Sequence, residues 1–131
     1  MRAPKSTRVL IVEDDFLVAE MVEGVLEEAG YPVVGKATDG RQAVEMALRL
    51  VPDVVLMDVH LPVMDGLEAS REILRQRPLP IVVLTAYEHE ELVQEAAAVG
   101  VGAFLVKPPT ATTLALAIDE AHANLARLPR S

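Results

Sequence analysis

A carboxylate at the end of an apolar run is the first feature of this sequence that could do chemistry. In the segment PDVVLMDVHLPVMDG, at 52–66, the run from Val54 to Met57 leads directly into Asp58. A run that is apolar at every position is typical of a strand covered on both faces. A carboxylate buried there is unfavourable unless a partner or a function requires it. Asp58 therefore indicates a chemical site at the end of a buried strand.

Other polar side chains follow similar runs elsewhere in the chain. The run at 8–13 leads into acids, the run at 79–85 ends on Thr85, and the run at 102–106 is followed by Lys107. The acids of the first run are Glu13, Asp14 and Asp15. We expect Asp15 to act as a helix cap or a solvated flank rather than as part of a site.

Gathered carboxylates repel one another, so that either some stay protonated or a cation neutralises them. Oxygen ligands without His or Cys suit a hard cation, and Mg2+ suits a site that keeps water ligands and awaits a phosphate. Thr85 can donate a hydrogen bond to an anion, and Lys107 can supply a positive charge. A carboxylate such as Asp58 can accept a phosphoryl group covalently. Together these groups predict a phosphoryl-transfer site.

Alternating strand and helix patterns supply the scaffold for this site. The predicted strands lie at 8–13, 31–37, 53–58, 79–85 and 102–106, and the predicted helices at 16–30, 38–50, 66–76, 89–100 and 110–128. Such alternation predicts right-handed crossovers and a parallel sheet. We expect an α/β fold of the flavodoxin-like, doubly wound type, with five parallel strands in the order 2-1-3-4-5 and helices on both faces. Ligands bind at the carboxyl ends of such strands where the order reverses, which places the acids of the first strand beside Asp58.

Local signals add detail to these elements. Val18, Val22, Val25 and Ala29 fall on one face of the first helix. Asp39 is a candidate N-cap for the second helix. Pro32 suits an edge position for the second strand, because proline cannot donate to a neighbouring strand.

Composition limits the class of protein. The chain has 131 residues, of which 51% are hydrophobic and 3% aromatic, and no cysteine. We expect one domain over 1–131, with a core at about 8–127 and no output domain. The net charge of −8 argues against direct binding of nucleic acid. No run approaches the roughly 20 apolar residues of a membrane span, and we expect a cytoplasmic protein without membrane contact.

Four segments carry a resemblance to a known family: VLIVEDD, PDVVLMDVHLPVMDG, PIVVLTA and GAFLVKP. In this order and spacing they resemble the receiver domain of bacterial two-component response regulators, from about Val9 to Leu125. The resemblance implies a switch that is phosphorylated by a sensor histidine kinase or a phosphotransfer protein and that signals through a downstream protein target. It implies no enzymatic activity beyond self-catalysed phosphorylation and dephosphorylation.

The resemblance also assigns residues to the metal site. It implies that Asp58 is the phosphoacceptor and that Glu13 and Asp14 form the acidic pair. Asp14 and Asp58 would bind Mg2+ directly, together with the backbone carbonyl of His60, and Glu13 would act through water.

The resemblance assigns a second group of residues to contact the phosphoryl group and respond to it. Thr85 and Lys107 would contact it, and Phe104 would be the switch aromatic in place of the tyrosine that many members carry. The Lys107–Pro108 bond would be cis. Pro109 replaces the aromatic residue that commonly follows this proline, which departs from the family pattern.

A narrower likeness and three alternatives complete the interpretation. EEAGYPVVGKATDGRQAVE and VLTAYEHEELVQEAAAVGVGAFLVKP resemble receivers that are fused to an RNA-binding antitermination module. We expect that module to be absent from this protein. The alternatives are a small Mg-dependent aspartyl phosphatase, a flavin carrier of the flavodoxin type, and a pseudo-receiver that works without phosphorylation. The phosphatase is disfavoured because Asp58 lies on the third strand rather than the first. The flavin carrier lacks a Ser/Thr/Gly-rich loop after the first strand, and the intact acids and lysine disfavour the pseudo-receiver.

Overall fold

Five strands and five helices alternate along the chain. The computed structural model describes residues 7–127. The strands are β1 (Val9–Val12), β2 (Val33–Ala37), β3 (Val54–Asp58), β4 (Ile81–Thr85) and β5 (Ala103–Val106). The helices are α1 (Phe16–Glu28), α2 (Gly40–Leu50), α3 (Gly66–Gln76), α4 (Glu90–Val99) and α5 (Ala111–Arg127). These bounds match the predicted elements to within a few residues at each end.

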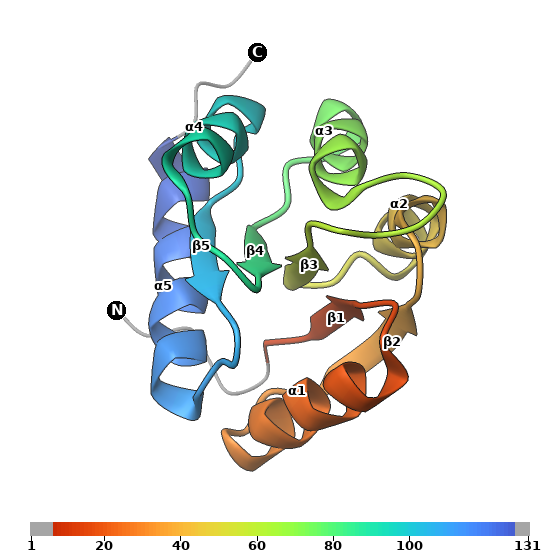
Figure 1. The fold of residues 1–131 in the computed structure, drawn as a ribbon. Coiled ribbons are helices and arrows are strands. Elements are labelled where there is room, and N and C mark those ends of the chain that lie inside the picture. The colour runs from red at the N-terminus through yellow and green to blue at the C-terminus, as the bar shows by residue number, and fades with distance from the viewer. Residues whose placement is uncertain (1–6, 128–131) are drawn as a thin grey trace.

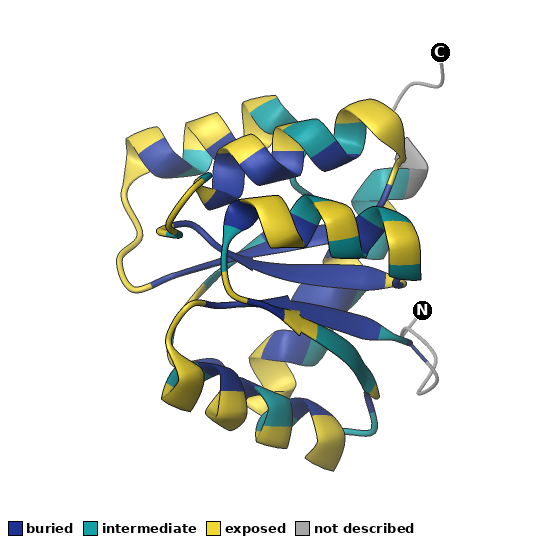
Figure 2. Ribbon diagram, turned by 90° about the vertical axis from the view of Figure 1, so that its right-hand side faces the viewer, coloured by how far each residue is buried: buried dark blue, intermediate teal, exposed yellow. Residues whose placement is uncertain are grey.

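The strands form one parallel sheet in the order β2-β1-β3-β4-β5. This order and the alternation of elements confirm the predicted flavodoxin-like fold. Helices α1 and α5 cover one face of the sheet, and α2, α3 and α4 cover the other (Figure 1). The sheet is therefore the middle of three layers, and Figure 2 shows its buried strands between helices with exposed outer faces.

Alternate residues of the central strands feed two separate cores. In β1, Leu10 and Val12 pack with α2, α3 and α4, whereas Val9 and Ile11 pack with α1 and α5. Because both faces are covered, every residue of β1, β3 and β4 is buried, as their continuous apolar runs predicted.

Local signals in the helices can now be compared with the structure. Asp39 is the N-cap of α2, and its side chain accepts a hydrogen bond from the backbone N–H of Gln42. On α1 the buried residues are Ala19, Val22 and Leu26. Val22 belongs to the predicted face, whereas Ala19 and Leu26 each follow a predicted residue by one position. The other predicted members of that face are only partly buried and pack against the edge of the core. The stripe shifts because α1 packs against α5 as well as against the sheet.

Two further expectations concern the edges of the molecule. Pro32 precedes β2, which is an edge strand, as its sequence suggested. No helix within residues 7–127 has the length and apolar character needed to span a membrane. The predicted end of the last helix at residue 128 lies outside the described residues.

Candidate functional site

Strand register gathers the predicted site residues at the carboxyl edge of the sheet. Val12 pairs with Met57, so the acids that follow β1 lie next to Asp58 at the end of β3. Asp58 pairs in turn with Leu84, which places Thr85 one position further along β4. The backbone N–H of Lys107 donates to the carbonyl of Thr85, which fixes the lysine beside the same edge.

Three carboxylates meet at this edge. One ligand atom each from Glu13, Asp14 and Asp58 lies within 4.8 Å of the other two. Glu13 and Asp58 are buried, whereas Asp14 is exposed. The donor set is oxygen only, and the open side at Asp14 leaves room for water ligands. The residues therefore fit a hard cation such as Mg2+.

Lys107 is the one basic side chain among the described residues that pairs with these carboxylates. Its Nζ donates to Glu13 Oε1 at 2.7 Å and lies 3.4 Å from Asp58 Oδ2. Burial alone would lower the pKa of Lys107, but the hydrogen bond to Glu13 and the charges of Asp58 and Glu13 outweigh it and raise the pKa above its ordinary value. Lys107 is therefore an ammonium at neutral pH, and a single positive charge faces three carboxylates.

Thr85 is buried at the end of β4, and its hydroxyl is engaged within its own loop. Thr85 Oγ1 donates to the carbonyl of Tyr87 at 3.0 Å, and the N–H of Tyr87 lies 3.3 Å from the same oxygen. To bond an anion at Asp58, this hydroxyl has to leave the Tyr87 carbonyl. This contact could not be predicted from the sequence, because a main-chain partner two residues away leaves no residue-type signal.

The side chains of Phe104 and Thr85 lie on one face of the sheet. Phe104 pairs with Val83 in β5 and β4, and side chains two residues apart on a strand share a face. The Phe104 ring is partly buried against the core under α2, α3 and α4. It is thus placed where a movement of Thr85 can reach it.

The β5–α5 connection carries the two prolines of the predicted site. The Lys107–Pro108 peptide bond is cis, as expected from the resemblance. Pro109, which stands where the family commonly has an aromatic residue, is buried. Thr110 directly precedes α5, and its hydroxyl and backbone N–H both bond Thr113.

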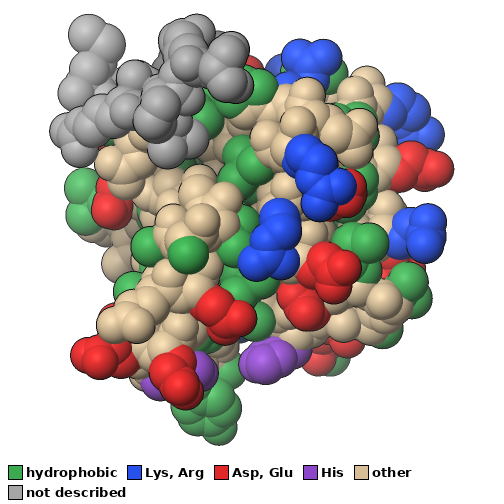
Figure 3. Space-filling view, turned by 90° about the horizontal axis from the view of Figure 1, so that it is seen from above, with side chains coloured by type: hydrophobic (Ala, Val, Ile, Leu, Met, Phe, Trp, Pro, Cys, Tyr) green, Lys and Arg blue, Asp and Glu red, His purple; other side chains and the backbone are tan. Residues whose placement is uncertain are grey.

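His60 lies two residues after Asp58, exposed in the loop between β3 and α3. Its ring helps to line a pocket of about 320 Å³ between α3 and α4, together with His89 and charged residues of both helices. In Figure 3 the histidine side chains lie at the lower edge of the visible face beside acidic side chains, and further acidic side chains lie among the Lys and Arg side chains. His89 is also the N-cap of α4, since its Nδ1 accepts from the N–H of Leu92 at 3.3 Å. The sequence analysis missed this role, because histidine is not a preferred N-cap residue.

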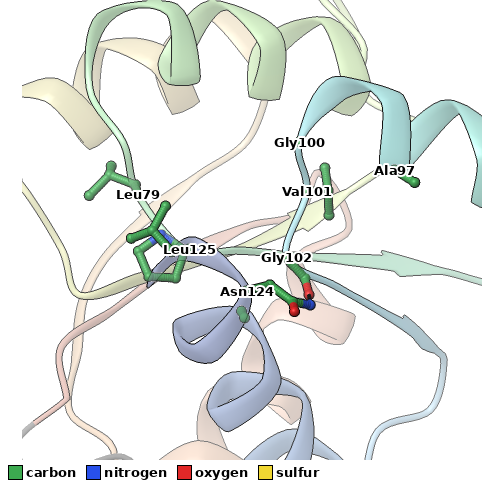
Figure 4. Close-up of a pocket in the computed structure, with 9 residues that line it drawn as sticks. Leu79, Ala97, Gly100, Val101, Gly102, Asn124 and Leu125 are labelled. Carbon is green, nitrogen blue, oxygen red and sulfur yellow. Dashed lines mark hydrogen bonds between the residues drawn. The ribbon is translucent and has the colours of Figure 1, made fainter. Parts of the chain in front are cut away.

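A second pocket lies at the opposite, amino edge of the sheet. It has a volume of about 270 Å³, and its lining is mostly apolar, with Leu79, Val101 and Leu125 among the contributors (Figure 4). The side chain of Asn124 also lines it and donates to the carbonyl of Gly102 at 2.7 Å. None of the described residues that line this pocket has a charged side chain.

Comparison with known proteins decides what this arrangement is. The family model of the response regulator receiver domain matches residues 9–119. The chain belongs to this family. The receiver is 46% identical over 112 residues to the transcriptional regulatory protein PdtaR of Mycobacterium tuberculosis, covering 86% of this chain and 55% of that protein. It is 42% identical over 102 residues to the chemotaxis protein CheY of Thermotoga maritima, covering 77% of this chain and 85% of that protein. The chain thus spans about half the length of the PdtaR relative.

Solved structures agree with this assignment. The receiver matches the signal receiver domain of a modulated diguanylate cyclase from Desulfovibrio desulfuricans G20 with a TM-score of 0.83 and 35% identity, over 94% of this chain and 99% of that one. It matches the receiver domain of the sensor histidine kinase PA1611 from Pseudomonas aeruginosa PAO1 with a TM-score of 0.80 and 34% identity, over 90% and 98% of the two chains. That structure holds a magnesium ion coordinated in its active-site cleft. These likenesses do not favour the phosphatase, flavin-carrier or pseudo-receiver alternatives.

Proposed function

We propose that this receiver is a phosphorylation-activated switch of a two-component phosphorelay, and that Asp58 is the residue that accepts the phosphoryl group. The single observation that carries the proposal is a buried carboxylate that shares one edge with two further acids and lies 3.4 Å from an ammonium. A structural role alone does not explain three carboxylates facing one lysine, because the excess negative charge is unfavourable.

The proposed metal site uses the same acids. Asp14 and Asp58 would hold Mg2+ directly, with the carbonyl of His60 as a further ligand and Glu13 acting through water. When bound, the ion supplies positive charge that offsets carboxylate repulsion and the charge of the incoming phosphoryl group. Glu13 is held for this role on two sides, since one oxygen accepts from Lys107 and the other from the N–H of Asp15.

Phosphoryl transfer then needs three actions from the chain. A carboxylate oxygen of Asp58 attacks the phosphorus of the donor, a P–O bond forms, and the bond from phosphorus to the donor's leaving group breaks. The Lys107 ammonium moves its charge from the carboxylates to the phosphoryl oxygens. The Thr85 hydroxyl leaves the carbonyl of Tyr87 and donates to a phosphoryl oxygen instead.

The partners follow from this chemistry. The donor is a sensor histidine kinase or a phosphotransfer protein, and the receiver signals through contacts with a downstream protein. We expect this exchange to take place in the cytoplasm.

Intact mass measurement tests the assignment. Incubation with acetyl phosphate and Mg2+ should add the mass of one phosphoryl group to the wild-type protein, and the gain should be absent in Asp58→Ala. Asp53→Ala is a matched control, because Asp53 precedes the same strand at its opposite end. It should be phosphorylated like the wild type. A phosphoryl group that persists in Asp58→Ala would refute the assignment.

A further inference from the structure

The loop between β3 and α3 rests on the first residue of α2. The backbone N–H of Gly40 points to the carbonyl of Pro62 at 3.5 Å. A Cβ atom built on Gly40 would overlap the carbonyl oxygen of Met64 and would lie 2.6 Å from its carbonyl carbon and 2.8 Å from its Cβ. The contact is therefore backbone against backbone, and no side-chain rotation could relieve an added methyl group.

This loop is strained where it meets α2. Val63 has a φ of 70°, a region that β-branched residues rarely adopt, and its side chain is 75% exposed. The N–H of Met64 donates to the carbonyl of Pro62 at 2.7 Å, which closes a three-residue turn around Val63. Burial of the Val63 side chain cannot hold this conformation, so contacts on either side of the turn must hold it.

Those contacts are found at both ends of the loop. At the α3 end, the N–H of Gly66 donates to the carbonyl of Val59 at 2.8 Å, and a Cβ on Gly66 would overlap the carbonyl oxygen of Asp58. At the α2 end, Gly40 provides the second close approach. The loop that carries His60 is thus clamped between two glycine backbones.

The α2 side of the clamp is itself fixed. Asp39 accepts from the N–H of Gln42 at 2.8 Å, and Gln42 Oε1 accepts from both the N–H and the hydroxyl of Thr38 at 3.0 Å. The residue before Thr38 is Ala37, whose carbonyl accepts from the N–H of Glu13 at 3.0 Å. The start of α2 and the acids after β1 therefore belong to one hydrogen-bonded frame.

We propose that Gly40 is a positioning residue for the metal site, and that the N-terminus of α2 sets the position of the β3–α3 loop relative to the acids. A side chain at position 40 would push the loop away from α2 and carry the carbonyl of His60 out of line with Asp14 and Asp58. The inference rests on the proposed function, because it presumes that this loop supplies a ligand to Mg2+.

The test compares Gly40→Ala with Gly24→Ala. Gly24 is also a helical glycine, but a Cβ there has nothing within 4 Å, so the same substitution is made without a contact. Two-dimensional 1H–15N NMR would record the amide shifts of residues 59–64 without metal and would follow a Mg2+ titration in each protein. Gly40→Ala should displace the loop shifts in the metal-free protein and weaken Mg2+ binding about 10-fold or more, as losses around a metal site commonly do. Gly24→Ala should leave both readouts at their wild-type values.

A purely structural role for Gly40 would lower the melting temperature and leave the Mg2+ dissociation constant unchanged, and that result would overturn the inference. If Gly40→Ala does not fold, Asp39→Ala loosens the start of α2 without adding a Cβ, and it should weaken Mg2+ binding about two- to fivefold. Wild-type affinity in Asp39→Ala would then overturn the inference. If the wild-type protein does not bind Mg2+ at millimolar concentration, the proposed function is overturned together with this inference. If the wild type binds Mg2+ and Gly40→Ala binds it with the same dissociation constant, only this inference is overturned.

Discussion

The two edges of the sheet use charge in opposite ways. At the carboxyl edge, three carboxylates lie together, two of them are buried, and the Lys107 ammonium pairs with those two. At the amino edge, the N–H of Arg8 donates to Asp53 Oδ2 at 2.8 Å, and the guanidinium donates to the carbonyls of Leu50 and Val51 at 3.1 and 2.9 Å. Arg8 thus binds the end of α2 and the start of β3 together, through one backbone bond to a carboxylate and two guanidinium bonds to carbonyls.

This difference in polar contacts indicates that the amino edge stabilises the fold, whereas the carboxyl edge is suited to binding a ligand. At the amino edge, the Arg8 guanidinium satisfies carbonyls that the end of a helix leaves without partners, and the Arg8 backbone N–H binds Asp53. The carboxyl edge gathers three carboxylates and one lysine, so we expect repulsion to lower the stability of the metal-free protein and a bound cation to offset it. Substitutions at the two edges should therefore change stability and ligand binding in different combinations.

The largest effect is expected from the acids. Asp58→Asn and Asp14→Asn should each weaken Mg2+ binding about 100-fold or more, since each removes a charged ligand. The metal-free Asp58→Asn protein should be more stable than the wild type by about 1 kcal/mol, because repulsion at the edge falls. Urea unfolding with and without Mg2+ measures both quantities. A lower metal-free stability in Asp58→Asn than in the wild type would show that carboxylate repulsion does not destabilise this edge.

Removal of Lys107 should have the next largest effect, in the opposite direction. Lys107→Ala leaves two buried carboxylates without their charged donor and should destabilise the metal-free protein by about 2 kcal/mol. Mg2+ binding should persist, because Lys107 is not a ligand. Phosphorylation should no longer alter the amide shifts of β5 and α5. Equal shift changes in the variant and the wild type would contradict this role.

The pH dependence of Lys107 has a defined sign. Its pKa is raised above 10.5 in the folded state by Glu13 and Asp58, which overcome the opposing effect of burial. The stability it contributes is complete below pH 10.5 and is lost as the pH rises through the raised value. Between pH 6 and 9, the difference in stability between the wild type and Lys107→Ala should therefore show no contribution from titration of the lysine.

The amino edge should respond in stability alone. Arg8→Met keeps the aliphatic stem and removes the guanidinium bonds to the carbonyls of Leu50 and Val51. We expect a loss of about 1 kcal/mol in the free energy of unfolding, because charge-assisted bonds at a partly exposed site contribute modestly. The Mg2+ dissociation constant should equal that of the wild type in the same titration. A weaker constant would mean that the two edges are coupled through the sheet.

Much of the carboxyl edge could be predicted from the sequence, because apolar runs and the residues that end them are local patterns. Parallel strand order then brings Glu13, Asp58 and Thr85 to one edge without any knowledge of side-chain contacts. The same reasoning predicted the fold and the cap at Asp39. The amino edge was not predicted, because the bonds of Arg8 join residues more than 40 positions apart.

Backbone geometry was the other part that the sequence did not disclose. Val51 ends α2 in the left-handed region and Val63 strains the β3–α3 loop, although valine disfavours positive φ at both sites. From the sequence, Gly40 is only the residue that follows the N-cap of α2. The structure shows that the carbonyl of Met64 lies against it and leaves no room for a Cβ atom. Such positions are set by tertiary contacts that overrule local preference. Val63 and Gly40 lie in and against the β3–α3 loop, whereas Val51 lies at the amino edge beside Arg8.

The smallest change in stability, and the sharpest test of the carboxyl edge as a switch, is expected from Thr85. Its hydroxyl bonds only within its own loop, so Thr85→Val, which keeps the shape and removes the donor, should lower stability by about 1 kcal/mol or less. The variant should still accept a phosphoryl group at Asp58, because the nucleophile and the acids are intact.

What should disappear is the response of Phe104. In the wild type, we expect a phosphoryl group to draw the Thr85 hydroxyl away from the carbonyl of Tyr87 through a charge-assisted bond. The space it leaves would lie on the same sheet face as Phe104, and the ring, which has no hydroxyl to hold it at either position, should turn inward to gain burial. The phosphoryl group would thus shift the balance between two existing arrangements near α4. NMR of the Phe104 ring and of the amides of α4, with and without beryllofluoride, should show this shift in the wild type and in Thr85→Ser, which keeps the hydroxyl. Identical shifts in Thr85→Val would show that the carboxyl edge reaches Phe104 by a route other than this hydroxyl.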